Sequence, residues 1–230
     1  MDAIILAGGF GTRLREVVPD LPKPMAPVAG HPFLEILLTM LARKGFTRVV
    51  LSLCFMSEKI ITHFGERYAG IDLVYEVESQ PLGTGGAIRA ALTRCMKDHA
   101  FIFNGDTYLD IEADEIERLW QTSQHPIIVV REAPDVARFG SVEMQDGQIQ
   151  RFLEKGNTGP GLINAGCYVL PKNILDDIPL GRPFSLETEF FAEHLQRIRF
   201  EGFVTHGQFI DIGVPEDYAR AQIELANLSA

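Results

Sequence analysis

Cysteine is scarce in this 230-residue sequence, and its three copies stand far apart, at Cys54, Cys95 and Cys167. No two of them show the C-x-x-C spacing of a metal site, and an odd number is atypical of a disulfide framework. We therefore interpret them as buried, reduced thiols, which are typical of proteins from a reducing compartment.

Long apolar runs are missing as well. No stretch reaches the roughly 18 apolar residues of a transmembrane helix. The chain also does not open with a basic segment followed by an apolar one, as a secretory signal peptide does. We expect a soluble, cytoplasmic protein that does not bind membranes.

Basic residues are outnumbered: 21 Lys and Arg stand against 31 Asp and Glu, a formal net charge of −10. This balance argues against general binding of nucleic acid or of anionic membranes. It does not exclude a nucleotide, because a pocket can be locally cationic within an acidic protein.

Several other catalytic signals are absent. The six histidines show no metal-ligand spacing, and Ser185 has no G-x-S-x-G context. No internal repeat, low-complexity segment, hexapeptide β-helix tail or Ser/Gly/Pro-rich linker divides the chain. With 46% hydrophobic and 23% charged residues, we expect one globular domain over residues 1–230.

Strand and helix patterns alternate through the first half. Apolar strand patterns at 3–7, 49–53, 71–77, 100–103 and 127–130 are separated by helical ones. This order predicts an α/β fold, a doubly wound, mostly parallel, Rossmann-like sheet with helices on both faces. Ligands of such sheets bind outside the carboxyl ends of the strands.

The rhythm changes after about residue 135. Asp146-Gly147 predicts a hairpin, strands follow at 163–170, 200–205 and 209–212, and helical patterns cover 186–195 and the segment after Pro215. We interpret residues 1–135 as a nucleotide-binding half and residues 136–230 as a small strand-and-helix half for a second substrate.

The first 25 residues form the most informative stretch. The apolar strand Ala3–Ala7 runs into Gly8, Gly9 and Gly11, and such turns expose backbone N–H groups to anions. Arg13 and Lys23 add two positive charges. A G-x-G-x-x-G dinucleotide fingerprint is excluded because leucine stands at the third glycine, which disfavours a dehydrogenase, and no lysine follows the glycines as in a P-loop. The stretch predicts a phosphate cradle.

The string G-G-x-G-T-R-L, followed by P-K-P, resembles the signature of the sugar-1-phosphate nucleotidyltransferases, and the resemblance runs from residue 2 to about 220. Glu16 and Val18 replace a proline and a threonine that many members have. The resemblance implies a GT-A-like nucleotidyltransferase fold. It implies that the catalytic residues are Arg13, Lys23 and Asp106. It implies that a nucleotide binds Leu6, Ala7, Gly8, Gly9, Gly11, Thr12, Arg13, Lys23, Glu78, Pro81, Gly83 and Thr84.

Two carboxylates, Asp106 and Asp211, interrupt apolar strands, where an unpaired charge is costly. Each stands beside glycine and would also suit a turn. The segments Gly105-Asp106 and 211–218 (D-I-G-V-P-E-D-Y) resemble the family's Mg²⁺-binding motifs, although Phe209 replaces a common tryptophan. The resemblance therefore implies Mg²⁺ as cofactor on Asp106 and Asp211.

A glycine-rich segment at 78–87 follows a strand and opens a helix, which also suits a plain flexible loop. The family places the nucleobase here. Guanine offers ring N–H and NH₂ donors along one edge, and a carboxylate accepts both. We predict that Glu78 makes this contact.

The sugar-phosphate site is implied by resemblance alone. Glu154-Lys155 is similar to the family's E-K-P element, with Gly156 in place of proline, and segment 164–168 (N-A-G-C-Y) to its sugar-binding strand. The expected sugar-phosphate-binding residues are Asn104, Gly140, Glu154, Lys155, Asn164 and Gly166.

Subtler motifs, R-x-V-V, P-L-G-T-G-G-A-I and F-N-G-D, resemble the heptose-phosphate guanylyltransferase branch. They imply GTP and a heptose 1-phosphate as partners, for surface polysaccharide synthesis. Mannose-1-phosphate guanylyltransferases and N-acetylmuramate-1-phosphate uridylyltransferases stay open as alternatives, and so does a non-catalytic nucleotide-sugar sensor. The sequence leaves a homo-oligomer open.

Overall fold

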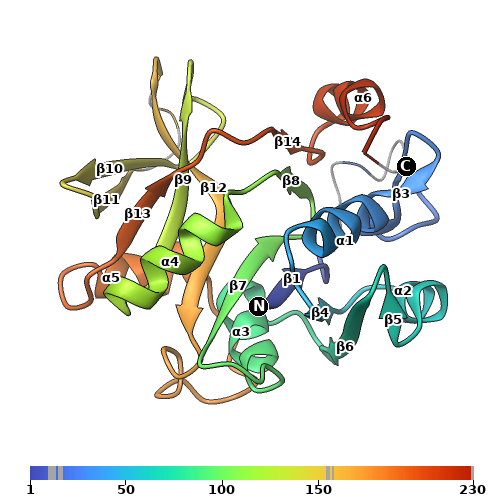
Figure 1. Cartoon of the computed structure of the whole chain (residues 1–230), viewed down its shortest axis with the longest axis horizontal. Helices are drawn as coiled ribbons and strands as arrows, with labels where there is room; N and C mark the ends of the chain where they lie inside the picture. The colour runs from blue at the N-terminus through green and yellow to red at the C-terminus, as the bar shows by residue number, and fades with distance from the viewer. Residues whose placement is uncertain (10–13, 15–17, 154–155, 157, 229–230) are drawn as a thin grey trace.

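The computed structural model describes residues 1–9, 14, 18–153, 156 and 158–228. A ten-stranded sheet crosses the molecule, with β5 towards one end and β10 and β11 at the other (Figure 1). Its strand order is β10-β11-β13-β9-β12-β7-β1-β4-β6-β5. Two small sheets, β2 with β3 and β8 with β14, accompany it.

The strands of the large sheet are β1 (Asp2–Leu6), β4 (Arg48–Leu53), β5 (Arg67–Tyr68), β6 (Ile71–Val77), β7 (His99–Asn104), β9 (Ile127–Ala133), β10 (Ser141–Gln145), β11 (Gln148–Leu153), β12 (Gly161–Pro171) and β13 (Glu201–Val204). The short sheets contain β2 (Pro27–Val28), β3 (His31–Pro32), β8 (Thr107–Leu109) and β14 (Phe209–Asp211). The helices are α1 (Phe33–Arg43), α2 (Ser57–Phe64), α3 (Gly83–Leu92), α4 (Ala113–Ser123), α5 (Ala192–His194) and α6 (Pro215–Glu224), with a 3₁₀ turn η1 (Lys23–Met25) and a π-helix η2 (Leu186–Phe191).

Strand β1 lies at the centre of the parallel part of the sheet. It pairs in parallel with β4 on one side and β7 on the other, and β4 pairs in parallel with β6. Both faces of β1 are covered, which explains its continuous run of apolar residues. The carboxyl ends of β1, β4 and β7 therefore meet at one edge of the sheet.

Alternate side chains of β1 enter two separate apolar cores. Ala3 and Ile5 pack with apolar residues of α1, α2, α4 and α6 on one face. Ile4 packs with residues of α3 and η2 on the opposite face. This two-residue alternation places helices on both faces, as the sequence predicts.

The predicted α/β class with helices on both faces is confirmed, but the sheet is mixed, and its parallel pairs are limited to the β7-β1-β4-β6 run and to β9 with β13. Strand β12 lies between β7 and β9 and runs antiparallel to both. The β10–β11 pair, joined by the predicted Asp146-Gly147 turn, is also antiparallel. The long β12 brings the second half of the chain into the same sheet, directly beside β7.

The predicted helix at 186–195 is present in a different form. Its first part, η2, is a π-helix whose N-cap Ser185 accepts a hydrogen bond from the Thr188 N–H, and α5 continues it. A π-helical turn widens the helix and is frequent at functional sites.

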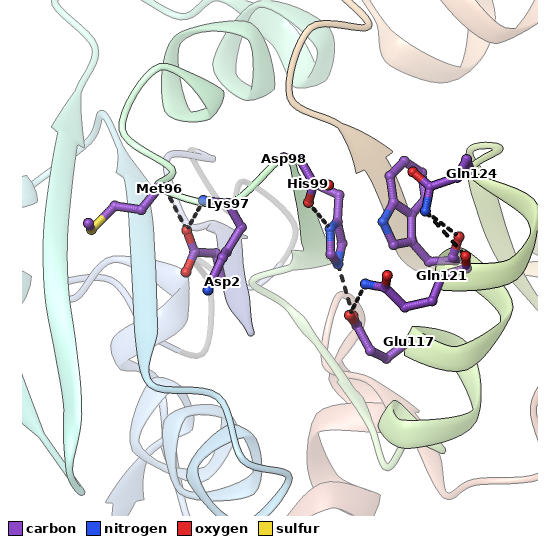
Figure 2. A network of polar contacts seen from close by, with 9 residues as sticks. Asp2, Met96, Lys97, Asp98, His99, Glu117, Gln121 and Gln124 are labelled. Atoms are coloured by element: carbon purple, nitrogen blue, oxygen red, sulfur yellow. Dashed lines mark hydrogen bonds and ion pairs between the residues drawn. The ribbon is translucent and has the colours of Figure 1, made fainter.

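The amino-terminal ends of β1 and β7 carry a polar network (Figure 2). Asp2 accepts hydrogen bonds from the N–H groups of Met96 and Lys97, at 2.7 and 3.1 Å. The buried His99 ring lies between Asp98 and Glu117, at 2.7 and 2.8 Å. At this edge, Asp2 and both His99 ring nitrogens are paired, whereas the buried indole N–H of Trp120, which stacks on His99, has no partner among the described residues.

Among the residues that the structure describes, no helix is both long enough and apolar enough to cross a membrane.

Candidate active site

A cavity of about 330 Å³ opens at the carboxyl edge of β1, β4 and β7. It is lined by Leu6, Ala7, Gly8, Gly9, Lys23, Pro24, Ser52, Glu78, Pro81, Leu82, Gly83, Thr84, Ala87, Asn104, Gly105 and Asp106. Every nucleotide-binding residue predicted from the sequence and described by the structure is among them. The predicted Gly11, Thr12 and Arg13 lie outside the described residues.

Strands β1 and β7 approach closely at the floor of this cavity. The Gly105 N–H donates to the Leu6 carbonyl at 3.0 Å, and the Ala7 N–H donates to the Ser52 carbonyl at 2.9 Å. A Cβ atom at position 105 would lie 2.5 Å from the Leu6 carbonyl oxygen. Glycine is therefore required before Asp106, and it lets Asp106 follow β7 directly at the edge where ligands of such sheets bind.

Lys23, Asp106 and Asp211 form one charged cluster, although they lie far apart in the sequence. The Lys23 ammonium lies 2.6 Å from an Asp106 carboxylate oxygen, and the Lys23 side chain is only 12% exposed. Strand β14 pairs with β8, which places Asp211 opposite Thr107, and the Ile212 N–H donates to the Asp106 carbonyl at 2.9 Å. Lys23 thus pairs with Asp106, and the charges of both act on the neighbouring Asp211.

The charge of this cluster is unbalanced. Burial raises the pKa of Asp211 above its usual 3.8, and the charge of Asp106 raises it further, while the Gly213 N–H and Lys23 lower it. A carboxylate in this position is stabilised by an additional cation nearby. The Asp106 side chain remains 39% exposed and so is accessible to one.

This donor set fits a divalent metal ion such as Mg²⁺. Among the described residues, no group of three or more His, Cys, Asp or Glu side chains is placed to hold a metal. Magnesium is usually bound through one or two carboxylates together with substrate phosphates and waters, so a carboxylate pair beside a cavity suffices.

Glu78 lines the cavity between two strand ends and the loop before α3. Its carboxylate accepts hydrogen bonds from the Ser52 hydroxyl at 3.0 Å and from the Leu82 N–H at 2.9 Å. Burial raises the pKa of Glu78 above its usual 4.5, against the lowering effect of these two hydrogen bonds. Each oxygen keeps acceptor capacity for a ligand, since an ionised carboxylate offers about four lone-pair sites.

The predicted sugar-side residues are arranged around β12. Asn104 lines the cavity, whereas Asn164, Gly166 and Gly140 lie next to it in the fold and are not part of the lining. The Asn164 N–H donates to the Gly140 carbonyl at 3.2 Å. A Cβ at Gly166, whose φ is +71°, would lie 2.6 Å from the Asn104 amide nitrogen, so the β12 backbone packs against Asn104. The predicted Glu154 and Lys155 lie outside the described residues.

Sequence reasoning missed Pro24, Ser52, Leu82, Ala87 and Gly105 as lining residues, and it gave Glu187 no role at the site. Ser52 is a hydroxyl residue inside the apolar strand β4, and this contrast was the signal that could have found it. The Tyr168 hydroxyl donates to Glu187 at 2.9 Å, a contact across 19 positions that no local pattern announces.

Comparison with known proteins agrees with this geometry. Residues 2–227 match the family described as nucleotidyl transferase. The D-glycero-alpha-D-manno-heptose 1-phosphate guanylyltransferase of Aneurinibacillus thermoaerophilus is 40% identical, over 98% of both chains. The mannose-1-phosphate guanylyltransferase of Mycobacterium tuberculosis is 35% identical over 98% of this chain, which spans 64% of that relative.

Among solved structures, HddC from Yersinia pseudotuberculosis complexed with GMP-PN superposes with a TM-score of 0.85 at 38% identity, over 96% of this chain and 97% of that one. The glycines that follow β1, the Lys23–Asp106–Asp211 cluster and the match over nearly the whole chain point the same way. This chain belongs to the nucleotidyl transferase family.

Proposed function

We propose that this protein transfers a guanylyl group from GTP to D-glycero-α-D-manno-heptose 1-phosphate and so makes GDP-heptose and pyrophosphate for surface polysaccharide synthesis. The observation that carries the proposal is the cavity at the carboxyl edge of β1, which is lined by Gly8, Gly9, Lys23 and Asp106, with Asp211 close to Asp106. A phosphate chain requires such an arrangement of backbone N–H groups and cations.

In the proposed reaction, a phosphate oxygen of the sugar phosphate attacks the α-phosphorus of GTP in line. A new P–O bond forms there, and the bond to the oxygen that bridges the α- and β-phosphorus breaks, so that pyrophosphate leaves with the electron pair. The nucleophile is already an anion near neutral pH. The protein therefore has to position two anions and neutralise their charge, and it does not need a general base.

Each group of the cluster has one task in this reaction. Lys23 holds the α-phosphate and aligns the attack, and Arg13 stabilises the leaving pyrophosphate. Asp106 and Asp211 hold Mg²⁺, which when bound neutralises phosphate charge. The Lys23–Asp106 distance of 2.6 Å supports this division, because the ammonium is already held beside the carboxylate pair.

Guanine is the proposed base because Glu78 presents a carboxylate to the cavity beside Leu82 and Thr84. The ring N–H and NH₂ groups of guanine both donate, and the remaining lone pairs of Glu78 accept. Uracil and thymine have one such ring N–H and no NH₂, so they satisfy the carboxylate less well.

The sugar phosphate is proposed to bind beside β12, near Asn104, Gly140, Asn164 and Gly166, with Glu154 and Lys155 completing the site. Residues 1–135 then act as the nucleotide half of one domain and residues 136–230 as its sugar-phosphate half. We place the reaction in the cytoplasm. Heptose is favoured over mannose because the chain matches a heptose enzyme over its full length.

The experiment that tests this proposal is Mg²⁺-dependent release of pyrophosphate over a grid of substrates. One axis holds GTP, UTP, dTTP, CTP and ATP, and the other holds the 1-phosphates of heptose, mannose, glucose and N-acetylmuramate. The proposal expects dominant release with GTP and heptose 1-phosphate. Another dominant pair would correct the substrates and keep the chemistry, while nucleotide binding without any release would indicate a sensor.

A further inference from the structure

A chain of hydrogen bonds runs from the nucleotide side of the cavity to the sugar side, and it passes through Glu187. The Thr84 hydroxyl, in the first turn of α3, donates to one Glu187 oxygen at 3.0 Å. The Tyr168 hydroxyl, on β12, donates to the other at 2.9 Å. One carboxylate on the π-helix therefore holds two elements that otherwise belong to different halves of the chain.

The connection continues on both sides. Towards the nucleotide, the Thr84 hydroxyl accepts from the Leu186 N–H at 2.9 Å, and Thr84 itself lines the cavity. Towards the sugar, the Tyr168 hydroxyl accepts from the Asn164 amide at 2.8 Å. The side-chain oxygen Oδ1 of Asn164 in turn accepts from the Gly166 N–H at 2.9 Å.

The far end of this chain returns to the cavity, because Gly166 packs against the Asn104 side chain and Asn104 is a lining residue. Each hydroxyl in the chain both donates and accepts, so a change at one end alters the geometry at the next. Tyr168 is 1% exposed and stays protonated, since burial and the charge of Glu187 raise its pKa well above the usual value.

We infer that Glu187 is a positioning residue that couples the two substrate sites, so that nucleotide bound at Thr84 orders the β12 strand around Asn164 and Gly166 for the sugar phosphate. This inference rests on the proposed function for the identity of the two substrates. The coupling is reciprocal, so bound sugar phosphate must also tighten nucleotide binding.

The matched control is Glu189, two residues along the same π-helix. It is exposed and accepts a hydrogen bond from the Ser185 N–H at 2.7 Å, and among the described residues it forms no hydrogen bond with Thr84 or Tyr168. Glu189→Gln makes the same change of charge on the same helix. Thr84→Ser keeps the hydroxyl and is the conservative rescue, whereas Thr84→Val removes it.

The kinetic test measures KM and kcat for both substrates. Glu187→Gln is expected to raise the KM for the sugar phosphate, at saturating GTP, by about tenfold or more, since the amide has one acceptor oxygen for the hydroxyls of Thr84, Tyr168 and Ser185. Tyr168→Phe and Thr84→Val are expected to raise it similarly, and Thr84→Ser to raise it less than Thr84→Val, while Glu189→Gln retains the original value. An unchanged KM in Glu187→Gln would overturn the inference.

A second measurement does not depend on turnover. Backbone hydrogen–deuterium exchange is followed in peptides covering 82–86 and 162–168, with and without GTP. In the original protein and in Glu189→Gln, GTP is expected to slow exchange in both peptides. In Glu187→Gln, GTP is expected to slow exchange in peptide 82–86 alone. Should Glu187→Gln not fold, Tyr168→Phe replaces it with the same expected result.

The outcomes separate the two proposals. Exchange coupling without pyrophosphate release from any pair would contradict the proposed function and support the role of Glu187. Suppose that pyrophosphate is released with GTP, but GTP protects residues 162–168 equally in Glu187→Gln and in the original protein. That result would support the proposed function and overturn the coupling role of Glu187. A protein that does not bind GTP at all would overturn both.

Discussion

Polar side chains lie at both ends of strands β1 and β7, but the amino-terminal and carboxyl edges of the sheet differ in how these side chains are paired. At the amino-terminal edge, Asp2 caps the turn at Met96 and Lys97, and His99 lies between two carboxylates and stacks on Trp120 at 4.8 Å (Figure 2). At the carboxyl edge, the chain forms a cavity in which Lys23 pairs with the partly exposed Asp106, and Asp211 lies close to both.

Under the proposed function, the same kinds of residue serve structure at one edge and chemistry at the other. Both His99 ring nitrogens face carboxylate oxygens, so each is paired within the network at that edge. Asp211, in contrast, has a pKa raised by burial and by its neighbour Asp106, which marks incomplete neutralisation. Perturbed carboxylates beside a cavity are candidates for function.

The largest effect is expected from Lys23→Ala, which removes the only ammonium described in the carboxyl-edge cluster. We expect kcat for pyrophosphate release to fall by roughly 10²–10³-fold, the usual order when a charge-stabilising group is lost. The matched control is Lys44→Ala, because Lys44 also pairs with an aspartate at 2.6 Å but away from the cavity. Turnover close to normal in Lys23→Ala would refute the assignment.

The next effect concerns the carboxylate pair. Asp106→Asn and Asp211→Asn should each lower the rate by roughly 10²-fold at fixed Mg²⁺, because each removes negative charge that holds the cation. A titration with Mg²⁺ should show a higher half-saturating concentration in both variants, and a chelator should abolish release. Asp110→Asn, the partner of Lys44, is the control; an Mg²⁺ dependence unchanged in all three variants would show that the pair binds no metal.

The amino-terminal edge should respond in the opposite way. His99→Ala leaves Asp98 and Glu117 without their shared partner, so the free energy of unfolding should fall by about 1–3 kcal/mol. Its kcat should stay unchanged, because His99 lies at the other end of β7. Urea denaturation measures the loss, with the exposed His206→Ala as control, and a loss of kcat without a loss of stability would contradict the structural role.

The smallest effect is the pH dependence of Glu78. Because burial raises its folded-state pKa above 4.5, the folded protein binds this proton more tightly than the unfolded chain does. Protonated Glu78 therefore stabilises the folded protein below pH 4.5, and this stabilisation is lost as the pH rises through the raised pKa. The difference in stability between the original protein and Glu78→Gln, followed by urea denaturation from pH 4 upwards, should shrink or reverse over that window.

Guanine binding should depend on pH in the opposite direction to stability, since only ionised Glu78 accepts both donors of the base. Affinity for GTP is expected to fall as the pH falls through the raised pKa of Glu78, and to become flatter in Glu78→Gln. Calorimetric titration measures this. Glu78→Gln is used in both the stability and the binding experiment. The pH response of Asp211 is common to this variant and the original protein, so it cancels when the two are subtracted.

The sequence predicted the carboxyl edge well, because its chemistry is local in the chain. Glycines directly after β1 and Asp106 directly after β7 mark the strand ends, and parallel strands bring such ends together. The family motifs indicated Lys23 and Asp211, but only the fold shows that both lie close to Asp106.

The sugar side and the coupling through Glu187 could not be predicted in the same way. Thr84 and Glu187 lie 103 positions apart, and a threonine or a glutamate at a helix start is ordinary. The antiparallel insertion of β12 between β7 and β9 was also hidden, because an apolar run does not reveal the direction of its neighbours.

The most direct test of the contrast between the two edges measures kcat and unfolding free energy together in Lys23→Ala and His99→Ala. The structure predicts that Lys23→Ala loses turnover by roughly 10²-fold or more and keeps its stability within about 1 kcal/mol, because Asp106 remains partly solvated. It predicts that His99→Ala loses stability and keeps turnover. Equal loss of both properties in both variants would contradict the assignment of chemistry to one edge and structure to the other.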